Sequence, residues 1–288
     1  MATTSIEASN LFNVKGLVAV VTGGGSGIGA MMARALALNG AAKVYIVGRR
    51  KDKLEEVAKS TSTSNIIIPI VGDVTSKENL AFIVSTVTQE VGFINVLIAN
   101  SGILGPQASI PKGTISSVAD FQKAYGDVEF EDYVDTFRLN AAGTWFTVMA
   151  FLGLLDEGNK KANVSQTSQV IATSSIASFN RAAPGGYAYG QSKAATTHLV
   201  KQLATGLVPF GIRSNAIAPG LFPSDMSATV IGGSDGNFPK SMIPLERVGT
   251  EEDMAGAILF LTSKAGAYVT GNVIVIDGGR LSNLPSAY

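Results

Sequence analysis

A tyrosine and a lysine four residues apart are the side chains of this chain best suited to acid–base chemistry. Tyr189 and Lys193 lie in the run YAYGQSK at 187–193, which predicts the first turns of a helix. Residues at i and i+4 share one helical face, and a nearby cation favours the phenolate. We therefore expect Lys193 to lower the pKa of Tyr189 from about 10 towards neutral pH. The phenol could then donate and accept a proton in a reaction.

A glycine-rich turn directly follows the first apolar run of the chain. Gly23, Gly27 and Gly29 come after VAVV at 18–21 and before a helix-forming segment. Glycines allow a tight turn and a close approach of a pyrophosphate, and a helix N-terminus offers free N–H groups. The pattern predicts a dinucleotide site. It lacks the Gly-Lys-Ser/Thr ending of a nucleoside triphosphatase loop.

Short apolar runs alternate with helix-forming segments along most of the chain. Strands are expected at 16–21, 44–47, 66–71, 96–98, 170–172, 214–217 and 273–276, and helices at 30–38, 51–59, 77–91, 187–207 and 251–261. Runs without a polar alternation suit strands buried on both faces. The sequence predicts an α/β protein with a single-domain Rossmann fold over 1–288, a doubly wound parallel sheet of about seven strands with helices on both faces. We expect 16–160 to bind a cofactor and 161–288 to carry the catalytic residues and substrate loops.

Three segments interrupt this rhythm. Pro69 cannot donate a hydrogen bond within a central strand, so its strand should lie at an edge or begin there. The connections 102–126 and 221–244 are long and rich in turn residues. Long ordered loops of compact domains are usually binding loops or lids.

The composition excludes several classes of function. Twenty-two basic residues balance 22 acidic ones, which argues against nucleic-acid and anionic-membrane partners. The chain has no cysteine, so it has no disulfide, zinc–thiolate site or thiol nucleophile, and its single histidine, His198, makes a histidine metal site or a hydrolase triad a poor fit. We predict no metal. Without a basic-then-apolar leader or an 18-residue apolar stretch, a cytoplasmic protein with no membrane partner is expected.

The two motifs together resemble those of the short-chain dehydrogenase/reductase family, single-domain NAD(P)-dependent oxidoreductases. These motifs are TGxxxGIG at 22–29 and Tyr189-x-x-x-Lys193. Further segments follow in the family's order: GDV at 72–74, NSG at 100–102, Asn140, SS at 174–175, NAIAPG at 215–220 and GNV leading to DGG at 271–279. The resemblance covers about 16–279.

The resemblance implies four catalytic residues. Tyr189 would be the general acid in reduction and the base in oxidation, and Lys193 would tune it and bind the nicotinamide ribose. Ser175 would hydrogen-bond the substrate carbonyl. Asn140 would hold a water molecule in a proton relay from Lys193.

It also implies a set of cofactor-binding residues. Asp73 would contact adenine, and Phe222 and Ser224 would lie near the nicotinamide carboxamide. The whole set is Gly23, Gly25, Ser26, Gly27, Ile28, Gly29, Arg49, Arg50, Asp73, Val74, Asn100, Ser101, Gly102, Tyr189, Lys193, Pro219, Gly220, Phe222 and Ser224.

The sequence departs from the family pattern in three places. Ala99 replaces the first asparagine of the family's Asn-Asn-Ala-Gly, which puts local hydrogen bonding in doubt. Ser175 precedes Tyr189 by one residue more than is usual, so Ser174 and Ser178 remain alternatives. The segment between Asn100 and Asn140 is longer than usual, and its role is open.

Basic residues after the second expected strand favour NADP(H). An acid there would bind the ribose 2′-OH of NAD, whereas arginine binds a 2′-phosphate. Arg49, Arg50 and Lys51 occupy this position without an acid. Arg49 is the first candidate for the phosphate contact and Arg50 the second.

The resemblance implies reversible NADPH-dependent reduction of a ketone or aldehyde to an alcohol. Segments 247–249 and 277–280 are similar to the 3-oxoacyl-carrier-protein reductase-like branch and to fungal secondary-metabolism ketoreductases. The alternative is a non-redox member of the family, structural or an isomerase or cyclase. Family members form dimers and tetramers through the helices bearing Asn140 and Tyr189, so a homo-oligomer is expected. Trp145 and Phe146 are expected in the core or in a subunit interface.

Overall fold

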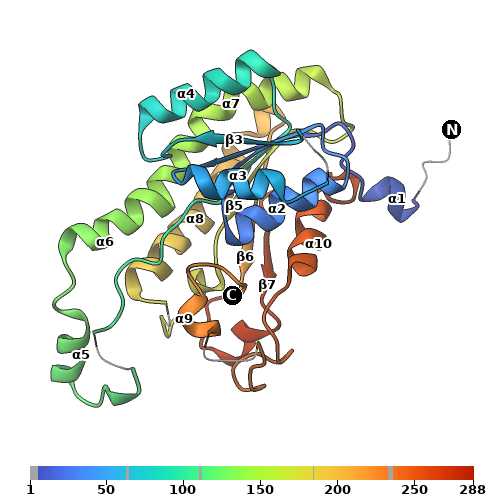
Figure 1. Ribbon diagram of the computed structural model, residues 1–288. Helices are drawn as coiled ribbons and strands as arrows, with labels where there is room; N and C mark the ends of the chain where they lie inside the picture. The colour runs from blue at the N-terminus through green and yellow to red at the C-terminus, as the bar shows by residue number, and fades with distance from the viewer. Residues whose placement is uncertain (1–5, 63–64, 110–111, 184, 233–235) are drawn as a thin grey trace.

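Seven parallel strands form one sheet at the centre of the molecule (Figure 1). The computed structural model describes residues 6–62, 65–109, 112–183, 185–232 and 236–288. The strands are β1 (Val18–Thr22), β2 (Lys43–Gly48), β3 (Ile67–Val71), β4 (Val96–Ala99), β5 (Gln169–Thr173), β6 (Arg213–Pro219) and β7 (Val273–Ile276). Their order is β3-β2-β1-β4-β5-β6-β7, and every neighbouring pair is parallel. The predicted fold class is confirmed.

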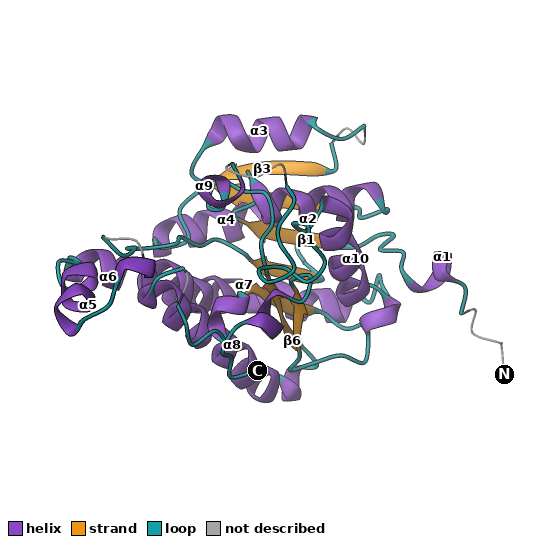
Figure 2. Cartoon of the chain, turned by 90° about the horizontal axis from the view of Figure 1, so that it is seen from below, coloured by secondary structure: helices purple, strands orange, loops and turns teal. Residues whose placement is uncertain are grey.

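Helices cover both faces of the sheet. They are α1 (Ala8–Leu11), α2 (Gly27–Leu38), α3 (Lys51–Lys59), α4 (Lys77–Glu90), α5 (Val118–Tyr125), α6 (Phe130–Phe137), α7 (Thr144–Lys161), α8 (Tyr187–Gly206), α9 (Ala228–Ile231) and α10 (Glu251–Thr262). One core cluster joins the sheet to α2 and α10, with Leu36 and Met254 fully buried. A second joins it to α4 and α7 through Ile83 and Phe151. Figure 2 shows the sheet between these two layers.

Strand burial explains the apolar runs of the sequence. Every residue of β1, β4, β5 and β6 is buried, because helices cover both faces of the central strands. Pro69 lies in β3, the strand at one end of the order, where it is paired in register with Ile46 of β2. The predicted edge position of this proline is confirmed.

One long helix carries a distortion at its middle. It runs from α6 to α7 through the π-helical segment η2 (Arg138–Gly143), and π-bulges occur often at functional sites. The helix is long and apolar enough to cross a membrane by length and composition alone. Val148, Phe151 and Leu155 are fully buried in the core, so packing against the sheet accounts for its composition.

The connection 102–126 is not the continuous loop that its length predicted. It contains η1 (Lys112–Thr114) and α5. The hydroxyl of Ser117 accepts from the N–H of Asp120 and the Asp120 carboxylate accepts from the N–H of Ser117, which is a capping box. This Ser-x-x-Asp signal is visible in the sequence and marks the start of α5.

Trp145 and Phe146 do not lie in the core of the chain, contrary to one of the two expected placements. Their exposed fractions are 42% and 41%. The Lys77 ammonium lies 4.9 Å from the ring centre of Phe146. Their placement in a subunit interface stays a prediction.

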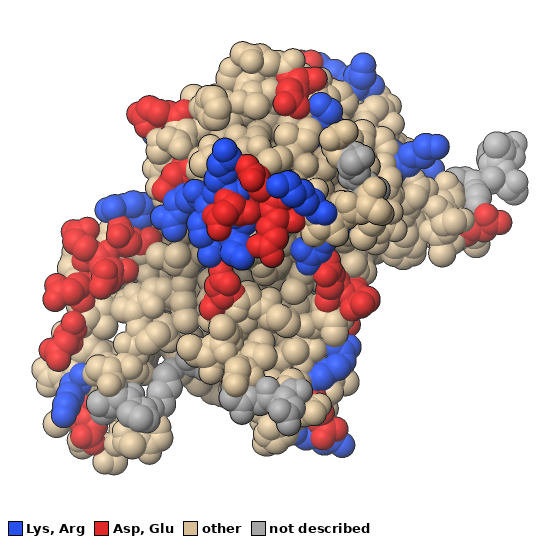
Figure 3. Space-filling model, in the orientation of Figure 1, with Lys and Arg blue, Asp and Glu red and all other residues tan. Residues whose placement is uncertain are grey.

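Charges of both signs alternate on the face that carries α3 (Figure 3). Lys53 and Lys59 each form ion pairs with acids of the same helix, Glu56 and Glu55. This face therefore presents no continuous basic surface of the kind that binds a nucleic-acid backbone.

Candidate active site

A cleft of about 970 Å³ opens at the carboxyl ends of the strands. It collects the segments that follow β1, β2, β3, β4, β5, β6 and β7. Every residue predicted to bind the cofactor lines it, as do Ser175, Tyr189 and Lys193. Asn140 is the exception, because it lies fully buried behind the wall of the cleft.

Close packing requires glycine at Gly23, in the turn after β1, and at Gly29, in the first turn of α2. A Cβ on Gly29 would meet the carbonyl oxygen of Gly23, and also the Asn100 amide nitrogen at 2.6 Å. Gly23 itself has a φ of +65°, a conformation that favours glycine. The Asn100 amide nitrogen donates to the carbonyl oxygen of Thr22 at 3.0 Å. Asn100 therefore holds the turn against the end of β4, and the replacement of the neighbouring family asparagine by Ala99 leaves this bond intact.

The first turn of α2 faces the cleft with free donors. Ser26 occupies the N-cap position but its hydroxyl makes no capping hydrogen bond. Uncapped N–H groups and the positive helix end attract phosphates. The glycines, which keep side chains out of this space, and these donors together fit the pyrophosphate of a dinucleotide.

Two arginines follow β2 at the same end of the cleft. Arg49 lies 3.9 Å from the Asp73 carboxylate. Arg50 donates to the hydroxyl of Ser26 at 3.1 Å and to the carboxylate of Asp225 at 2.9 Å. Both guanidinium groups are positioned where they could bind a 2′-phosphate. Asp225, from the connection after β6, is 175 positions from its partner Arg50, and no local sequence pattern indicates this pairing.

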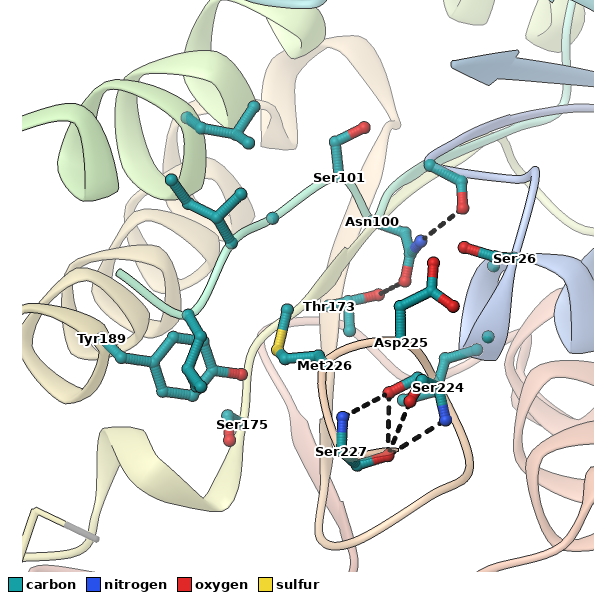
Figure 4. Close-up of a pocket in the computed structure, with 18 of the residues that line it drawn as sticks. Ser26, Asn100, Ser101, Thr173, Ser175, Tyr189, Ser224, Asp225, Met226 and Ser227 are labelled. Atoms are coloured by element: carbon teal, nitrogen blue, oxygen red, sulfur yellow. Dashed lines mark hydrogen bonds between the residues drawn. The ribbon is translucent and has the colours of Figure 1, made fainter. Parts of the chain in front are cut away.

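The side chains of Tyr189 and Ser175 lie close to each other in the cleft (Figure 4). Burial raises the pKa of Tyr189, and the hydrogen bond to Ser175 opposes this change. The alternative serines have other partners. The Ser174 hydroxyl lies 2.6 Å from that of Thr197, and the Ser178 hydroxyl donates to the Ser175 carbonyl oxygen. Ser175 is thus the serine beside the phenol.

Lys193 is buried beneath the tyrosine. Its ammonium donates to the carbonyl oxygen of Thr173 at 2.7 Å and lies 5.9 Å from the ring centre of Tyr189. Burial lowers the pKa of Lys193 to about 8. The expected lowering of the Tyr189 pKa by Lys193 is wrong for this structure: burial of the phenol dominates, and the lysine makes its hydrogen bond elsewhere.

The π-helical segment points Asn140 towards the lysine. Its amide group exchanges two hydrogen bonds with the backbone of Ile103, at 2.9 Å each, and donates to the Ser192 hydroxyl. A Cβ on Gly102 would meet the Asn140 amide oxygen at 3.0 Å and the Lys193 nitrogen at 3.3 Å. Gly102 therefore lets both polar groups approach the same wall. The Asn140 carbonyl accepts from the hydroxyls of Thr144 and Thr196.

Several lining residues were not singled out by sequence reasoning. Part of the long segment after β4 forms a wall through Leu104 and Gln107, and Gln107 donates to the carbonyl oxygen of Gly185 at 2.9 Å. Asp225 and Met226 enter from the connection after β6, and Arg280 from the turn after β7. These positions belong to long connections, where no periodic pattern predicts the direction of a side chain.

Comparison with known proteins identifies the family. The family profile described as "Enoyl-(Acyl carrier protein) reductase" matches residues 23–280. The short-chain dehydrogenase/reductase PhomF of Diaporthe leptostromiformis is 49% identical over 292 aligned positions, which cover 99% of this chain and 98% of that protein. The chain belongs to the short-chain dehydrogenase/reductase family. VdtF of Byssochlamys spectabilis, named in the same way, is 43% identical with 99% of both chains covered.

Solved structures of short-chain dehydrogenases/reductases agree with this assignment. The Pseudomonas aeruginosa "RhlG/NADP active-site complex" aligns with a TM-score of 0.80 and 30% identity, covering 94% of this chain and 98% of that one. The Brucella melitensis 3-ketoacyl-(acyl-carrier-protein) reductase, complexed with NADH, gives a TM-score of 0.75 and 25% identity over 93% of this chain and all of that one. These relatives support a nicotinamide-dependent oxidoreductase and do not favour the non-redox alternative.

Proposed function

We propose that the protein catalyses the reversible, NADPH-dependent reduction of a ketone or aldehyde to an alcohol. The observation that carries this proposal is the placement of the Tyr189 phenol, the Ser175 hydroxyl and the Lys193 ammonium in one cleft with the glycine-rich turn. A Pseudomonas aeruginosa relative, 30% identical over 93% of this chain and 97% of that protein, is named a 3-oxoacyl-[acyl-carrier-protein] reductase. Its name supports a ketone as substrate.

Each residue of the cleft has a role that its surroundings support. When bound, reduced nicotinamide supplies the hydride that the carbonyl carbon receives. Ser175 donates a hydrogen bond to the carbonyl oxygen, and Tyr189 transfers its phenolic proton to that oxygen as charge develops there. Lys193 holds a replacement proton for the phenol, and Asn140, whose amide oxygen approaches Gly102 on the same side as the Lys193 nitrogen, holds the water molecule of a proton relay from Lys193.

The cofactor preference rests on the two arginines after β2. Arg49 and Arg50 line the cleft with no acid at the end of the strand itself. A guanidinium pairs with a phosphate through charge-assisted hydrogen bonds. We propose NADP(H) over NAD(H) on this ground.

Turnover with both cofactors tests the proposal. Purified protein is assayed for consumption of NADPH and NADH against β-ketoesters, diketones and quinones, with Tyr189→Phe as the control. Loss of the phenolic proton should reduce kcat by about 10²–10⁴-fold while NADPH binding, measured by fluorescence, persists. Equal or better catalytic efficiency with NADH would refute the cofactor preference, and unchanged activity of the Tyr189→Phe variant would refute the mechanism.

The setting of the activity is part of the same proposal. We propose a cytoplasmic enzyme of secondary metabolism, and the similarity to short-chain dehydrogenases/reductases of fungi is consistent with this setting. Exposed aromatic side chains along α6 and α7, Phe130, Trp145 and Phe146, support a homo-oligomer, dimeric or tetrameric, with apolar contact area on these helices. A monomeric mass by light scattering at micromolar concentration would exclude the oligomer.

A further inference from the structure

Arg280 differs from the other basic side chains of the cleft. Of the six that line it, five have a polar partner: Arg49 with Asp73, Arg50 with Asp225, Lys53 with Glu56, Arg138 with Asp135, and Lys193 with the Thr173 carbonyl. The Arg280 guanidinium makes no hydrogen bond or ion pair with any residue that the structure describes, although it is half-buried. Because this guanidinium lies in the cleft and makes no bond within the described chain, its donors are available to an anionic ligand.

The turn after β7 explains why Arg280 lacks a partner in the chain. Its nearest acid in sequence, Asp277, accepts from the N–H of Gly279 at 2.9 Å and from the N–H of Leu281 at 2.7 Å. The carboxylate is used to hold the turn. Burial lowers the pKa of Arg280 and the charge of Asp277 opposes this change, so the guanidinium stays charged at neutral pH.

The sheet order places Arg280 on the substrate side of the site. β2 and β3, whose ends carry Arg49 and Asp73, lie at one edge of the sheet, and β7 lies at the other. Ser175, which follows β5, and Tyr189 lie between these edges and face the same cleft. The residues expected at the adenosine and phosphate end of the cofactor follow β1, β2 and β3, whereas Arg280 follows β7 and lines the same cleft beyond the segment that follows β6.

We propose that Arg280 binds a carboxylate of the substrate, which makes the substrate an oxo acid whose carbonyl lies at Tyr189 and Ser175. The inference rests on the proposed function. A guanidinium presents a planar pair of donors that match the two oxygens of a carboxylate. A phosphate of a carrier thioester or of the cofactor shares this anionic-oxygen chemistry, and the experiment separates these sources.

The test compares oxo acids with their methyl esters as substrates. Wild type, Arg280→Met, Arg280→Lys and Arg181→Met are assayed with each pair and with a coenzyme A thioester of the same acid. Arg181 is exposed, lies outside the cleft and is adjacent to Asn180 of its wall, so its substitution controls for the loss of one positive charge nearby.

We expect Arg280→Met to lower kcat/KM for the oxo acid on the order of ten- to hundredfold, because a hydrogen-bonded charge pair is lost. The ester should change by less than about twofold, Arg280→Lys should recover part of the loss, and Arg181→Met should behave as wild type. NADPH affinity should be unchanged. Equal losses for acid and ester, a loss confined to the thioester, or weaker NADPH binding would each overturn the carboxylate assignment.

A second readout separates this inference from the proposed function. Calorimetric binding of 2-naphthoate and its methyl ester to the NADP⁺-saturated protein requires no turnover. Stronger binding of the acid that disappears in Arg280→Met would support the carboxylate site even if no ketone is reduced. Equal binding of acid and ester to wild type would refute it, whatever the outcome of the turnover assays.

Discussion

The two ends of the cleft are built in different ways. At the β2 side, short turns follow the strands, and the fit of the site depends on glycine backbone and uncapped N–H groups. At the β7 side, long connections and the turn at Arg280 supply side chains from segments far apart in sequence. The first end uses features common to dinucleotide sites, and the second is built from side chains.

The largest effect is expected from Gly29→Ala, which adds a methyl group to the glycine backbone at the β2 side of the cleft. Gly29→Ala would place its Cβ against the Gly23 carbonyl oxygen, so we expect loss of NADPH binding by at least about 100-fold and destabilisation of about 1–3 kcal/mol. Fluorescence titration and urea unfolding measure the two effects.

Gly153→Ala is the matched control. A Cβ at Gly153 in α7 meets no atom within 4 Å, so alanine should stabilise the chain by about 0.5–1 kcal/mol and leave NADPH binding unchanged. Equal effects of the two substitutions would show that the glycine turn has no special packing role.

Arg49→Ala tests whether the β2 side of the cleft binds the 2′-phosphate of the cofactor. The substitution should weaken NADPH binding on the order of tenfold or more, as expected for a lost charge-assisted hydrogen bond. NADH lacks the 2′-phosphate and should bind within about twofold of wild type. A parallel loss for both cofactors would assign Arg49 a structural role instead.

Lys193→Met tests the lowered pKa of Lys193 through the free energy of unfolding rather than through turnover. The folded pKa of about 8 lies below the ordinary value of 10.5, so the unfolded chain binds more protons between these values, and stability rises with pH across that window. The methionine variant, which does not carry this cost, should be more stable than wild type by about 1–2 kcal/mol at pH 7.

The advantage of Lys193→Met should shrink as the pH rises from 8 towards 10. Urea unfolding at pH 7 and pH 9.5 measures it, and circular dichroism verifies the fold of the variant. A difference independent of pH would mean that the lysine titrates normally in the folded protein.

Asp225→Asn should have the smallest effect. The Arg50–Asp225 pair is largely exposed, at 56% and 70% of the two side chains, and such pairs contribute up to about 1 kcal/mol. Freeing Arg50 should strengthen NADPH binding about two- to threefold and leave NADH binding unchanged. Weaker NADPH binding would mean that Asp225 supports the cofactor site.

The sequence was sufficient for the sheet, for α2, α3, α4, α8 and α10, and for the first end of the cleft, but α7 was not among the helices expected from it. Apolar runs and glycine spacing reflect burial and backbone geometry, and these act locally, as the exact match of the 51–59 and 273–276 predictions illustrates. The bounds of α5 could have been found from its capping box at Ser117.

The second end of the cleft could not be predicted in the same way. Asp225 contacts Arg50 across 175 positions of the chain. Arg280 is distinguished by the absence of a hydrogen bond or ion pair to any residue that the structure describes, which no sequence pattern predicts. Contacts of this kind depend on how long connections fold over the sheet. The pKa of Tyr189 was mispredicted for a related reason, since the i+4 spacing says nothing of the burial of the phenol or of the Thr173 carbonyl that binds Lys193.

The contact between Arg50 and Asp225 has a kinetic consequence. Arg50 belongs to the cofactor end, while Asp225 precedes Met226 and α9 in the connection after β6, which lines the same cleft. A Cβ on Gly27 would meet that of Ser224 at 2.8 Å, so the same connection rests directly on the glycine turn. Because this connection contacts the cofactor end and also lines the rest of the cleft, we expect the two ligands to add in a compulsory sequence, with the dinucleotide first and the alcohol released before it.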